Sequence, residues 1–381
     1  MIALPQAALC IAKVDVFAFR APIATPVRTS FGEMHDRPAV FVRVTDEDGA
    51  VGWGEVWCNF PSCGAEHRAR LLVTVMRPLL LGRSFTGPAD TFTYLSQRTA
   101  VLAIQSGEPG PIAQTIAGID LALWDLCARR AGQPLWRYLG GTSGHVKVYA
   151  SGINPEQPQD TIAACQLEGY TAFKLKIGFG QDKDLSNLTN IRRKFGQDMP
   201  LMADANQAWT VQEACSMAPR LTEFGLAWLE EPLRADRPQR EWDLLAAACT
   251  TPLAAGENTI GYANFLTMIE DAPIKVIQPD IAKWGGISGC WPVIEAIQAK
   301  GKRYCPHYLG AGVGLLASAH LLAAVGGGGL LEIDSNPNPL RSALSGPLGS
   351  IRDGVAHLNE QPGLGVPIDI DRLIAMHLVP H

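Results

Sequence analysis

Short apolar runs alternate with segments of helix length along the chain from residue 146 onward. Runs of this kind, bounded by turn residues, predict buried parallel strands. Eight are found, at residues 146–151, 172–177, 200–205, 226–230, 252–256, 275–278, 302–306 and 329–333. Eight strands with room for one helix between neighbours predict an α/β fold, a (β/α) barrel of the TIM type.

An open, doubly wound sheet is the structural alternative. Such a sheet commonly carries a G-x-G-x-x-G turn after an early strand. The glycines at positions 310, 312 and 314 follow the seventh predicted strand and lack that spacing. The barrel is therefore the favoured fold.

The first part of the chain follows a different pattern. Partly alternating strands are expected at residues 14–20, 39–45 and 51–55. Helices are expected at residues 66–80, 89–100 and 112–131. Two irregular polar loops, 22–38 and 55–66, lie between these elements. The pattern predicts a small α+β unit ahead of the barrel.

Composition and charge narrow the class of protein. Of the 381 residues, 47% are hydrophobic and 18% are charged, which excludes a disordered chain. The net charge of −5 argues against a nucleic-acid partner. The nine cysteines include no C-x-x-C pair, and the uncharged stretch 309–331 contains seven glycines that would interrupt a membrane-spanning helix. We therefore expect a cytoplasmic protein with no membrane partner.

Charged and polar residues stand at or just after the carboxyl ends of seven consecutive predicted strands. They are Lys174 and Lys176, Asp204 and Asn206, Glu230 and Glu231, Glu257, Asp280 and Lys283, His307, and Glu332. A parallel barrel places the carboxyl ends of all its strands at one mouth, where active sites of this fold are found. The spacing therefore predicts one polar site built from seven strands.

The types of residue at that mouth suggest a specific chemistry. Asp204, Glu230 and Glu257 would bring three carboxylates together, and their repulsion calls for a cation between them. Three hard oxygen ligands favour Mg²⁺. Lys176 and His307 would flank the metal as two bases. A metal between two bases suits removal of a proton α to a carboxylate, with an enediolate intermediate.

The same residues carry a resemblance to a known family. The segments are Lys174-Leu-Lys176-Ile-Gly, Asp204-Ala-Asn206, Trp228-Leu-Glu-Glu-Pro232, Gly256-Glu-Asn258, Gln278-Pro-Asp280 with the following Ile-Ala-Lys-Trp-Gly-Gly, and Pro306-His307. Together they resemble the enolase superfamily, in its mandelate-racemase-like branch, over nearly the whole chain. The resemblance implies Mg²⁺ as cofactor, a small-molecule carboxylate as substrate, and an even-numbered homo-oligomer of up to eight subunits.

The resemblance also implies a domain arrangement. Residues 1–140 would form an α+β capping domain, residues 141–355 the modified (β/α) barrel, and residues 356–381 a segment that returns to the cap. The loops 22–38 and 55–66 look like the family's substrate-selecting loops. Arg28 and His35 in the first loop are therefore candidate substrate contacts.

By the same resemblance, the magnesium ligands are the three carboxylates named above. Lys176 corresponds to the base on one face, with Lys174 beside it to lower its pKa and to contact the substrate carboxylate. Asp280 and His307 correspond to the dyad on the opposite face, in which Asp280 orients the imidazole. Glu332 corresponds to the acid that hydrogen-bonds the enediolate.

Three positions depart from this pattern or leave it open. Asn206 stands where some sugar-acid dehydratases of the branch carry a histidine. Lys283 matches the second lysine of the muconate-lactonising branch and is also a candidate substrate contact, although the presence of Asp280 and His307 favours the dyad. Glu231 is expected to form ion pairs rather than to bind metal.

Several reactions share the enediolate. The polar loops favour dehydration of a sugar acid, an aldonate or an aldarate, to a 2-keto-3-deoxy acid. Racemisation or epimerisation of a hydroxy acid and cycloisomerisation of an aldarolactone are the alternatives. A sugar-acid binding protein with a decayed site is the non-enzymatic alternative, and the complete set of ligands and bases argues against it.

Overall fold

The computed structural model describes residues 4–29 and 32–377. Its larger part is built on eight parallel strands in sequence order. They are β5 (His145–Ile153), β6 (Phe173–Lys176), β7 (Leu201–Asp204), β8 (Leu229–Glu230), β9 (Leu253–Ala255), β10 (Ile274–Ile277), β11 (Arg303–Tyr304) and β12 (Leu331–Asp334). All eight strands predicted from the sequence are present.

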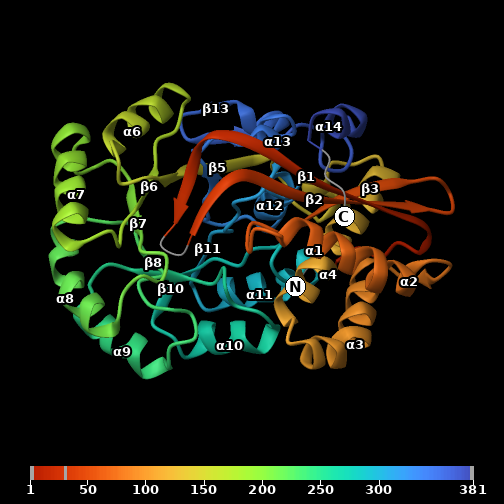
Figure 1. Cartoon of the computed structure of the whole chain (residues 1–381), viewed down its shortest axis with the longest axis horizontal. Coiled ribbons are helices and arrows are strands. Elements are labelled where there is room, and N and C mark those ends of the chain that lie inside the picture. The colour runs from red at the N-terminus through yellow and green to blue at the C-terminus, as the bar shows by residue number, and fades with distance from the viewer. Residues whose placement is uncertain (1–3, 30–31, 378–381) are drawn as a thin grey trace.

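The sheet curves round so that the last strand pairs with the first. Residues 331–334 of β12 are the ladder partners of residues 148–151 of β5. Between β11 and β12 the Leu330 N–H donates to Cys305 Sγ at 3.4 Å. The fold is a modified (β/α) barrel with an N-terminal capping domain, and Figure 1 shows helices around the outside of the strands.

Helices follow the first seven barrel strands, as the sequence predicts. They are α6 (Pro158–Leu167), α7 (Gln181–Phe195), α8 (Val211–Leu221) with the 3₁₀ turn 222–224, α9 (Gln239–Ala248), α10 (Tyr262–Glu270), α11 (Gly286–Ala299) and α12 (Gly312–Val325). Strands inside such a ring are buried on both faces, which explains their unbroken apolar runs. Among the described residues, no helix has the length and apolar character needed to cross a membrane.

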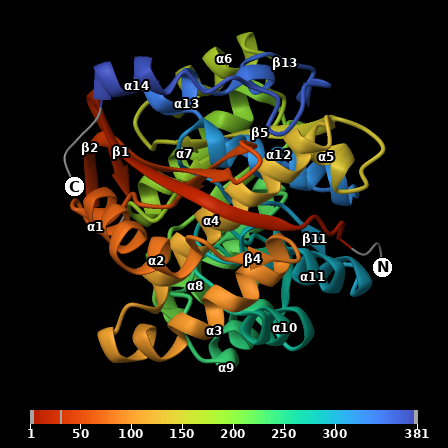
Figure 2. The same ribbon diagram turned by 90° about the vertical axis from the view of Figure 1, so that its right-hand side faces the viewer.

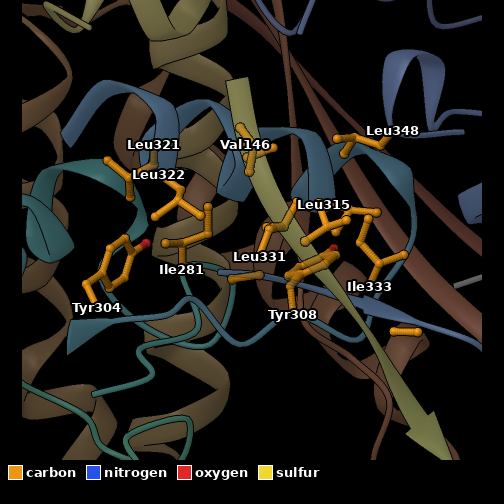
Figure 3. Packing of buried hydrophobic residues seen from close by; sticks show 14 of the residues in the cluster. Val146, Ile281, Tyr304, Tyr308, Leu315, Leu321, Leu322, Leu331, Ile333 and Leu348 are labelled. Carbon is orange, nitrogen blue, oxygen red and sulfur yellow. The ribbon is translucent and has the colours of Figure 1, made fainter. Parts of the chain in front are cut away.

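Two hydrophobic cores hold the barrel. One fills its interior and includes Tyr149, Met202 and Trp228 from β5, β7 and the residue before β8. The other lies between strands and helices. Figure 3 shows part of the second core, where Leu315 of α12 lies near Leu331 of β12. Burial of these side chains contributes about 25 cal/mol for each Å² of apolar surface removed from water.

The capping domain is an antiparallel sheet covered by helices. Its strands lie in the order β3-β2-β1-β4, with bounds β1 (Leu9–Thr29), β2 (Gly32–Asp46), β3 (Val51–Val56) and β4 (Ser84–Phe85). The helices are α1 (Gly64–Leu71), a π-helical turn 72–76, α2 (Arg77–Leu80), α3 (Pro88–Ser106), α4 (Pro109–Arg130) and the short α5 (Leu135–Tyr138). A Cβ on Gly54 would lie 1.9 Å from the Gly118 oxygen, so glycine allows α4 to pack directly on β3.

The prediction of an irregular loop at 22–38 is wrong. Strands β1 and β2 continue into a hairpin in which Val27 pairs with Met34, after an irregularity between Pro22 and Val27. The prolines and polar residues of this segment suggested a loop. A hairpin that extends beyond the rest of its sheet tolerates both, because part of its hydrogen-bonding edge faces no further strand.

Two carboxylates of the capping domain bind the starts of barrel helices. Asp120 of α4 accepts a hydrogen bond from the Ile287 N–H (2.7 Å) in the first turn of α11. Glu55 of β3 accepts from the N–H groups of Ala311 (2.6 Å) and Gly314 (2.8 Å) at the start of α12. The first N–H groups of a helix lack partners within it, so these contacts join the two units at otherwise unsatisfied donors.

The end of the chain returns to the capping domain. After β12 come α13 (Pro339–Ser342), a 3₁₀ turn at 346–349, and the strands β13 (Ile351–Arg352) and β14 (Val355–His357), of which β14 pairs with β5. The Leu364 N–H then donates to Asp125 of α4 at 2.7 Å. Helix α14 (Ile370–His377) lies against β1 (Figure 2). The domain limits at residues 140 and 355 stay a prediction.

One buried histidine makes the stability of this fold depend on pH. His320 of α12 accepts a hydrogen bond at Nδ1 from the Trp136 N–H (3.0 Å) of α5. Burial lowers the pKa of His320 from 6.5 to about 4. The unfolded chain therefore binds a proton at this residue between these two pH values while the folded chain does not. The stability that the neutral imidazole contributes is complete above pH 6.5 and is lost as the pH falls toward 4.

We expect the variant His320→Asn, which keeps an acceptor for Trp136 but cannot titrate, to lose this pH dependence. The free energy of unfolding should fall by about 3 kcal/mol more in the parent protein than in the variant between pH 6.5 and 4. Denaturant unfolding across this range measures the difference. A gap between the two proteins that stays constant with pH would contradict the assignment.

Candidate active site

A cavity of about 260 Å³ lies at the carboxyl ends of the barrel strands, beneath the capping domain. The hairpin of β1 and β2 contributes Val27, Met34 and Arg37, and the segment after β3 contributes Trp57, Asn59 and Phe60. The barrel contributes Asn154, Lys176, Asn206, Glu257, Lys283, His307, Asp334 and Asn336, among others. Both segments that were predicted to select the substrate therefore line the same cavity as the predicted bases.

Lys174 lies at the centre of the strand ends and is fully buried. Its Nζ contacts Glu230 Oε1 at 2.5 Å, Glu332 Oε1 at 2.6 Å and Asp204 Oδ2 at 3.8 Å. Burial by itself lowers the pKa of this ammonium, but the attraction of Glu230 and Glu332 outweighs it and holds the pKa well above its usual value. Lys174 therefore stays charged and joins the ends of β6, β8 and β12.

Lys176 lies one pleat farther along β6 and lines the cavity. Its Nζ donates to Asp204 Oδ2 and to Asn206 Oδ1, each at 2.7 Å. Burial and the neighbouring Lys174 both lower the pKa of Lys176, but Asp204 raises it more, so the net shift is upward. Lys174 therefore lowers the pKa of Lys176 as expected, but Asp204 acts in the opposite direction and sets the net shift.

His307 lies on the opposite side of the carboxylates from Lys176. Its Nδ1 is 2.8 Å from Asp280 Oδ2, and its Nε2 is 2.7 Å from Glu257 Oε2. Burial lowers the pKa of His307, but Glu257 and Glu332 outweigh that and raise it to about 10. Asp280 also accepts hydrogen bonds from the backbone N–H groups of the two residues 282 and 283, which fixes the carboxylate that orients the imidazole.

Lys283 lies beside the same carboxylate. Its Nζ donates to Glu257 Oε1 (2.9 Å) and Asn258 Oδ1 (3.2 Å), and its cation stands 4.9 Å from the centre of the Trp57 ring. Both Lys283 and His307 thus neutralise Glu257 in this structure. Lys283 reaches the cavity but is held on the Glu257 side of it.

The three carboxylates suggested as metal ligands occupy neighbouring positions. Asp204 and Glu230 are direct partners in the β7–β8 ladder, and Glu257 follows β9. Burial raises the pKa of Glu230 to about 7 even with the Lys174 ammonium at 2.5 Å, so a further cation would be needed to keep it fully ionised at neutral pH. Three carboxylates without sulfur or imidazole donors form a set of hard ligands that fits Mg²⁺.

In this structure the carboxylates are turned toward cationic side chains. Each one forms an ion pair, with Lys174, Lys176, Lys283 or His307. Within the described ranges, no three acidic, histidine or cysteine side chains converge closely enough to enclose a metal ion. Metal binding would therefore replace some of these ion pairs while leaving the backbone positions as they are.

Glu231 does not have the partners that were expected. Both of its carboxylate oxygens accept hydrogen bonds from Asn258 Nδ2, at 2.9 and 3.1 Å. Burial and the nearby Glu257 hold the pKa of Glu231 well above its usual value, which favours a neutral carboxyl group. In the part of the chain that the structure describes, no ion pair of Glu231 is found, so the predicted ion pair is wrong.

The two predicted contacts from the first cap segment have different outcomes. His35 points away from the cavity: its side chain is 74% exposed and faces Glu33 at 3.9 Å, so its assignment as a substrate contact is wrong. Alternation along β2 is the reason, because the neighbouring Met34 and this histidine lie on opposite faces. The side chain of Arg28 lies outside the described part of the structure.

Sequence reasoning missed a polar group on the cavity wall. Arg37, Asn154, Asp334 and Asn336 all line the cavity but were not predicted as site residues. One signal was available for Asp334: it stands two residues after Glu332, and residues two apart on a strand share a face. Asn154 and Asn336 lie just after β5 and β12, whereas the position of Arg37 depends on how the hairpin meets the barrel.

Comparisons with known proteins agree with this geometry. The mandelate racemase / muconate lactonizing enzyme N-terminal domain matches residues 11–140, and the enolase C-terminal domain-like family matches residues 159–372. The D-galactarolactone cycloisomerase of Agrobacterium fabrum is 30% identical over 366 residues, which cover 92% of this chain and 94% of that protein. Other relatives include sugar-acid dehydratases and cycloisomerases, and also o-succinylbenzoate synthases of two Geobacillus species.

Solved structures give the same result. A mandelate racemase/muconate lactonizing enzyme from Bordetella bronchiseptica RB50 is 57% identical, with a TM-score of 0.93 over 97% of this chain and 100% of that one. A racemase from Streptomyces coelicolor A3(2) with bound magnesium is 27% identical, with a TM-score of 0.84 over 96% and 99% of the two chains. This chain is therefore an enzyme of the enolase superfamily and belongs to its mandelate racemase/muconate lactonizing enzyme family.

Proposed function

We propose that this enzyme removes the proton α to the carboxylate of a sugar acid with the help of Mg²⁺, and that the resulting enediolate loses a hydroxyl group to give a 2-keto-3-deoxy acid. The observation that carries the proposal is the placement of Lys176 and of the Asp280–His307 dyad on opposite sides of the buried carboxylates of one cavity. Two such bases can reach both faces of an α-carbon held between them.

In this proposal Asp204, Glu230 and Glu257 hold the metal. Bound Mg²⁺ would supply positive charge that stabilises the enediolate. Lys174 would hold the substrate carboxylate from below, and Glu332, which accepts from Ser151 Oγ at 2.5 Å, would face the same carboxylate. Asn206 would keep Lys176 directed toward the cavity through its 2.7 Å hydrogen bond.

The proton balance of the dehydration needs one base and one acid. Either Lys176 or His307 takes the proton from C2, and the C2–H electrons enter the enediolate. The C3–O bond then breaks as the leaving hydroxyl takes a proton from His307 and departs as water. The enol product becomes the 2-keto form by gaining a proton at C3 and losing the proton on its C2 oxygen. Asp280 stabilises the imidazolium of His307 throughout.

Cycloisomerisation of a sugar-acid lactone is the second candidate. The relative with 30% identity over most of both chains is a D-galactarolactone cycloisomerase. In this enzyme, ring opening of a lactone would start from the same enediolate. Racemisation of a hydroxy acid requires no group beyond the two bases and the proposed metal. The three outcomes differ in product and can be separated in one assay.

The test is incubation of the purified enzyme with mono- and diacid sugars and their lactones in D₂O with Mg²⁺. We expect exchange of the C2 proton and a 2-keto-3-deoxy product for at least one acid, both followed by NMR. Racemisation would give substrate that carries deuterium at C2 with the opposite configuration there. Cycloisomerisation would convert a lactone into an isomeric acid. If no compound exchanges its α-proton, the proposal is wrong.

Two further properties belong to the same proposal. An even-numbered homo-oligomer follows from the family resemblance, and sedimentation or light scattering can test it. We propose a cytoplasmic location because nine dispersed cysteines with no C-x-x-C pair suit a reducing compartment.

A further inference from the structure

The wall of the cavity that faces β5 and β12 carries a polar cluster separate from the proposed metal ligands and bases. Arg37 of the hairpin is 2% exposed, lines the cavity, and donates from Nη2 to Asp334 Oδ2 at 2.7 Å. Among the described residues, Asp334 is the one hydrogen-bond partner of this guanidinium. Asn154 and Asn336 line the cavity beside it, and Asn154 Nδ2 donates to Asn336 Oδ1 at 3.1 Å.

Other contacts fix this cluster in place. Asp334 Oδ1 accepts from the Asn336 N–H (3.0 Å) and from Asn336 Nδ2 (2.8 Å). Arg341 lies on the other side, with Nη1 at 3.4 Å from Asp334 Oδ2 and Nη2 donating to the Asn336 oxygen at 2.7 Å. Two guanidinium groups therefore share a single carboxylate.

The net charge of the cluster follows from its two guanidinium groups and one carboxylate. Burial raises the pKa of Asp334, but Arg37 and Arg341 outweigh burial and hold the pKa below its usual value, so the carboxylate is ionised. Two positive groups and one negative group leave a net charge of about +1 on a buried wall. Uncompensated charge in such a place favours an anionic partner.

The cluster also lies in a suitable place for a substrate. Asp334 is two residues beyond Glu332 on β12, and its ladder partner on β5 is Ser151, the residue that bonds Glu332. The cluster therefore stands one pleat farther toward the capping domain than the groups proposed to hold the reacting carboxylate. A chain bound at the metal would extend toward this wall.

We propose that Arg37, together with the side-chain amide of Asn154, binds a second carboxylate at the far end of the substrate, so that the enzyme acts on diacid sugars (aldarates) in preference to aldonates. Asn336 holds this group in place, because its Nδ2 already donates to the Gly152 oxygen (2.9 Å) and to Asp334 Oδ1 (2.8 Å). This inference rests on the proposed function and specifies its substrate class. Arg37 makes the choice because, among the described capping-domain residues that line the cavity, it is the one with a positive charge, while Arg341 also pairs with Asp334.

The test compares pairs of acids that differ only at C6: galactarate with galactonate, glucarate with gluconate, and mannarate with mannonate. Binding in the presence of Mg²⁺ is measured by calorimetry, and C2-proton exchange in D₂O is followed in parallel. We expect the diacid of at least one pair to bind about 10- to 100-fold more tightly than its monoacid, the range of a hydrogen-bonded charge pair.

In Arg37→Met this preference should disappear, with the affinity for the monoacid changed much less. Arg37→Lys should restore part of it. Arg43→Met is the matched control, because Arg43 lies on the same strand, pairs with Asp15 at 2.7 Å and does not line the cavity. The control should keep the preference of the parent enzyme, and circular dichroism confirms that each variant is folded.

Three results would overturn the inference. The first is equal binding of diacid and monoacid in every pair. The second is a diacid preference that survives in Arg37→Met. The third is equal weakening of diacid and monoacid binding in Arg37→Met, which is expected if Arg37 only joins the hairpin to the barrel. In each case C2-proton exchange by the parent enzyme would still support the proposed function. Absence of exchange with all six acids would count against that function instead.

Discussion

Replacing Glu230 with Gln is expected to lower turnover by at least about 10³-fold and to weaken Mg²⁺ binding, while the barrel still folds. The loss follows from removal of a negative charge from one of the two most buried proposed ligands, which are Asp204 and Glu230. The fold should survive because Lys174 keeps its 2.6 Å contact with Glu332. Calorimetric titration with Mg²⁺, steady-state kinetics and circular dichroism measure the three effects.

Glu231→Gln is the matched control for this variant. Glu231 is the next residue, is equally buried, and favours a neutral carboxyl group, so an amide of the same shape should change little. Removal of divalent ions with EDTA should reproduce the effect of Glu230→Gln in the parent enzyme. Full activity in EDTA would refute the metal site, and a larger loss in Glu231→Gln than in Glu230→Gln would exchange the two assignments.

Replacing either base should separate proton exchange from turnover. Lys176→Ala and His307→Asn are each expected to lower kcat by about 10²- to 10⁴-fold, the usual contribution of a general acid or base. One of the two bases takes the C2 proton from its own face of the substrate. The variant that retains this base should still exchange the C2 proton with D₂O. His307→Asn should then lose product formation, because no acid remains for the departing hydroxyl group.

The dyad adds a graded test. Asp280→Asn should behave like a weaker form of His307→Asn, because Asp280 orients and stabilises the imidazole at 2.8 Å without touching the substrate. Lys283→Ala is the control and should be less damaging than Lys176→Ala, since Lys283 is held against Glu257 and Asn258. If Lys283→Ala is as damaging as Lys176→Ala while His307→Asn stays active, a two-lysine mechanism replaces the dyad.

The correct sequence predictions concern elements whose signals are local. A strand buried on both faces needs an unbroken apolar run. The strands β6 and β7 could therefore be predicted from residues 172–177 and 200–205 alone. Residues at the ends of such strands meet at one mouth in any parallel barrel. For that reason Lys176 and His307 could be assigned to one cavity although they are 131 positions apart in the sequence.

The errors concern features that depend on contacts between distant segments. The hairpin of β1 and β2 extends as far as Val27 and Met34, and its pairing decides that His35 faces solvent while Met34 faces inward. A shift of one residue in register would reverse these faces, and the polar composition of the segment does not determine the register.

The sequence by itself determined the barrel, the order of its strands and the set of charged groups at their ends, because each of these follows from short apolar runs and a fixed topology. Tertiary structure alone decided the partners of those groups. The net pKa shift of Lys176 is upward, although Lys174 lowers it, because Asp204 lies 2.7 Å away. Arg37 contacts Asp334, which is 297 positions away in the sequence. Charge interactions vary steeply with distance in a buried site, and those distances are set by how the hairpin packs on the barrel.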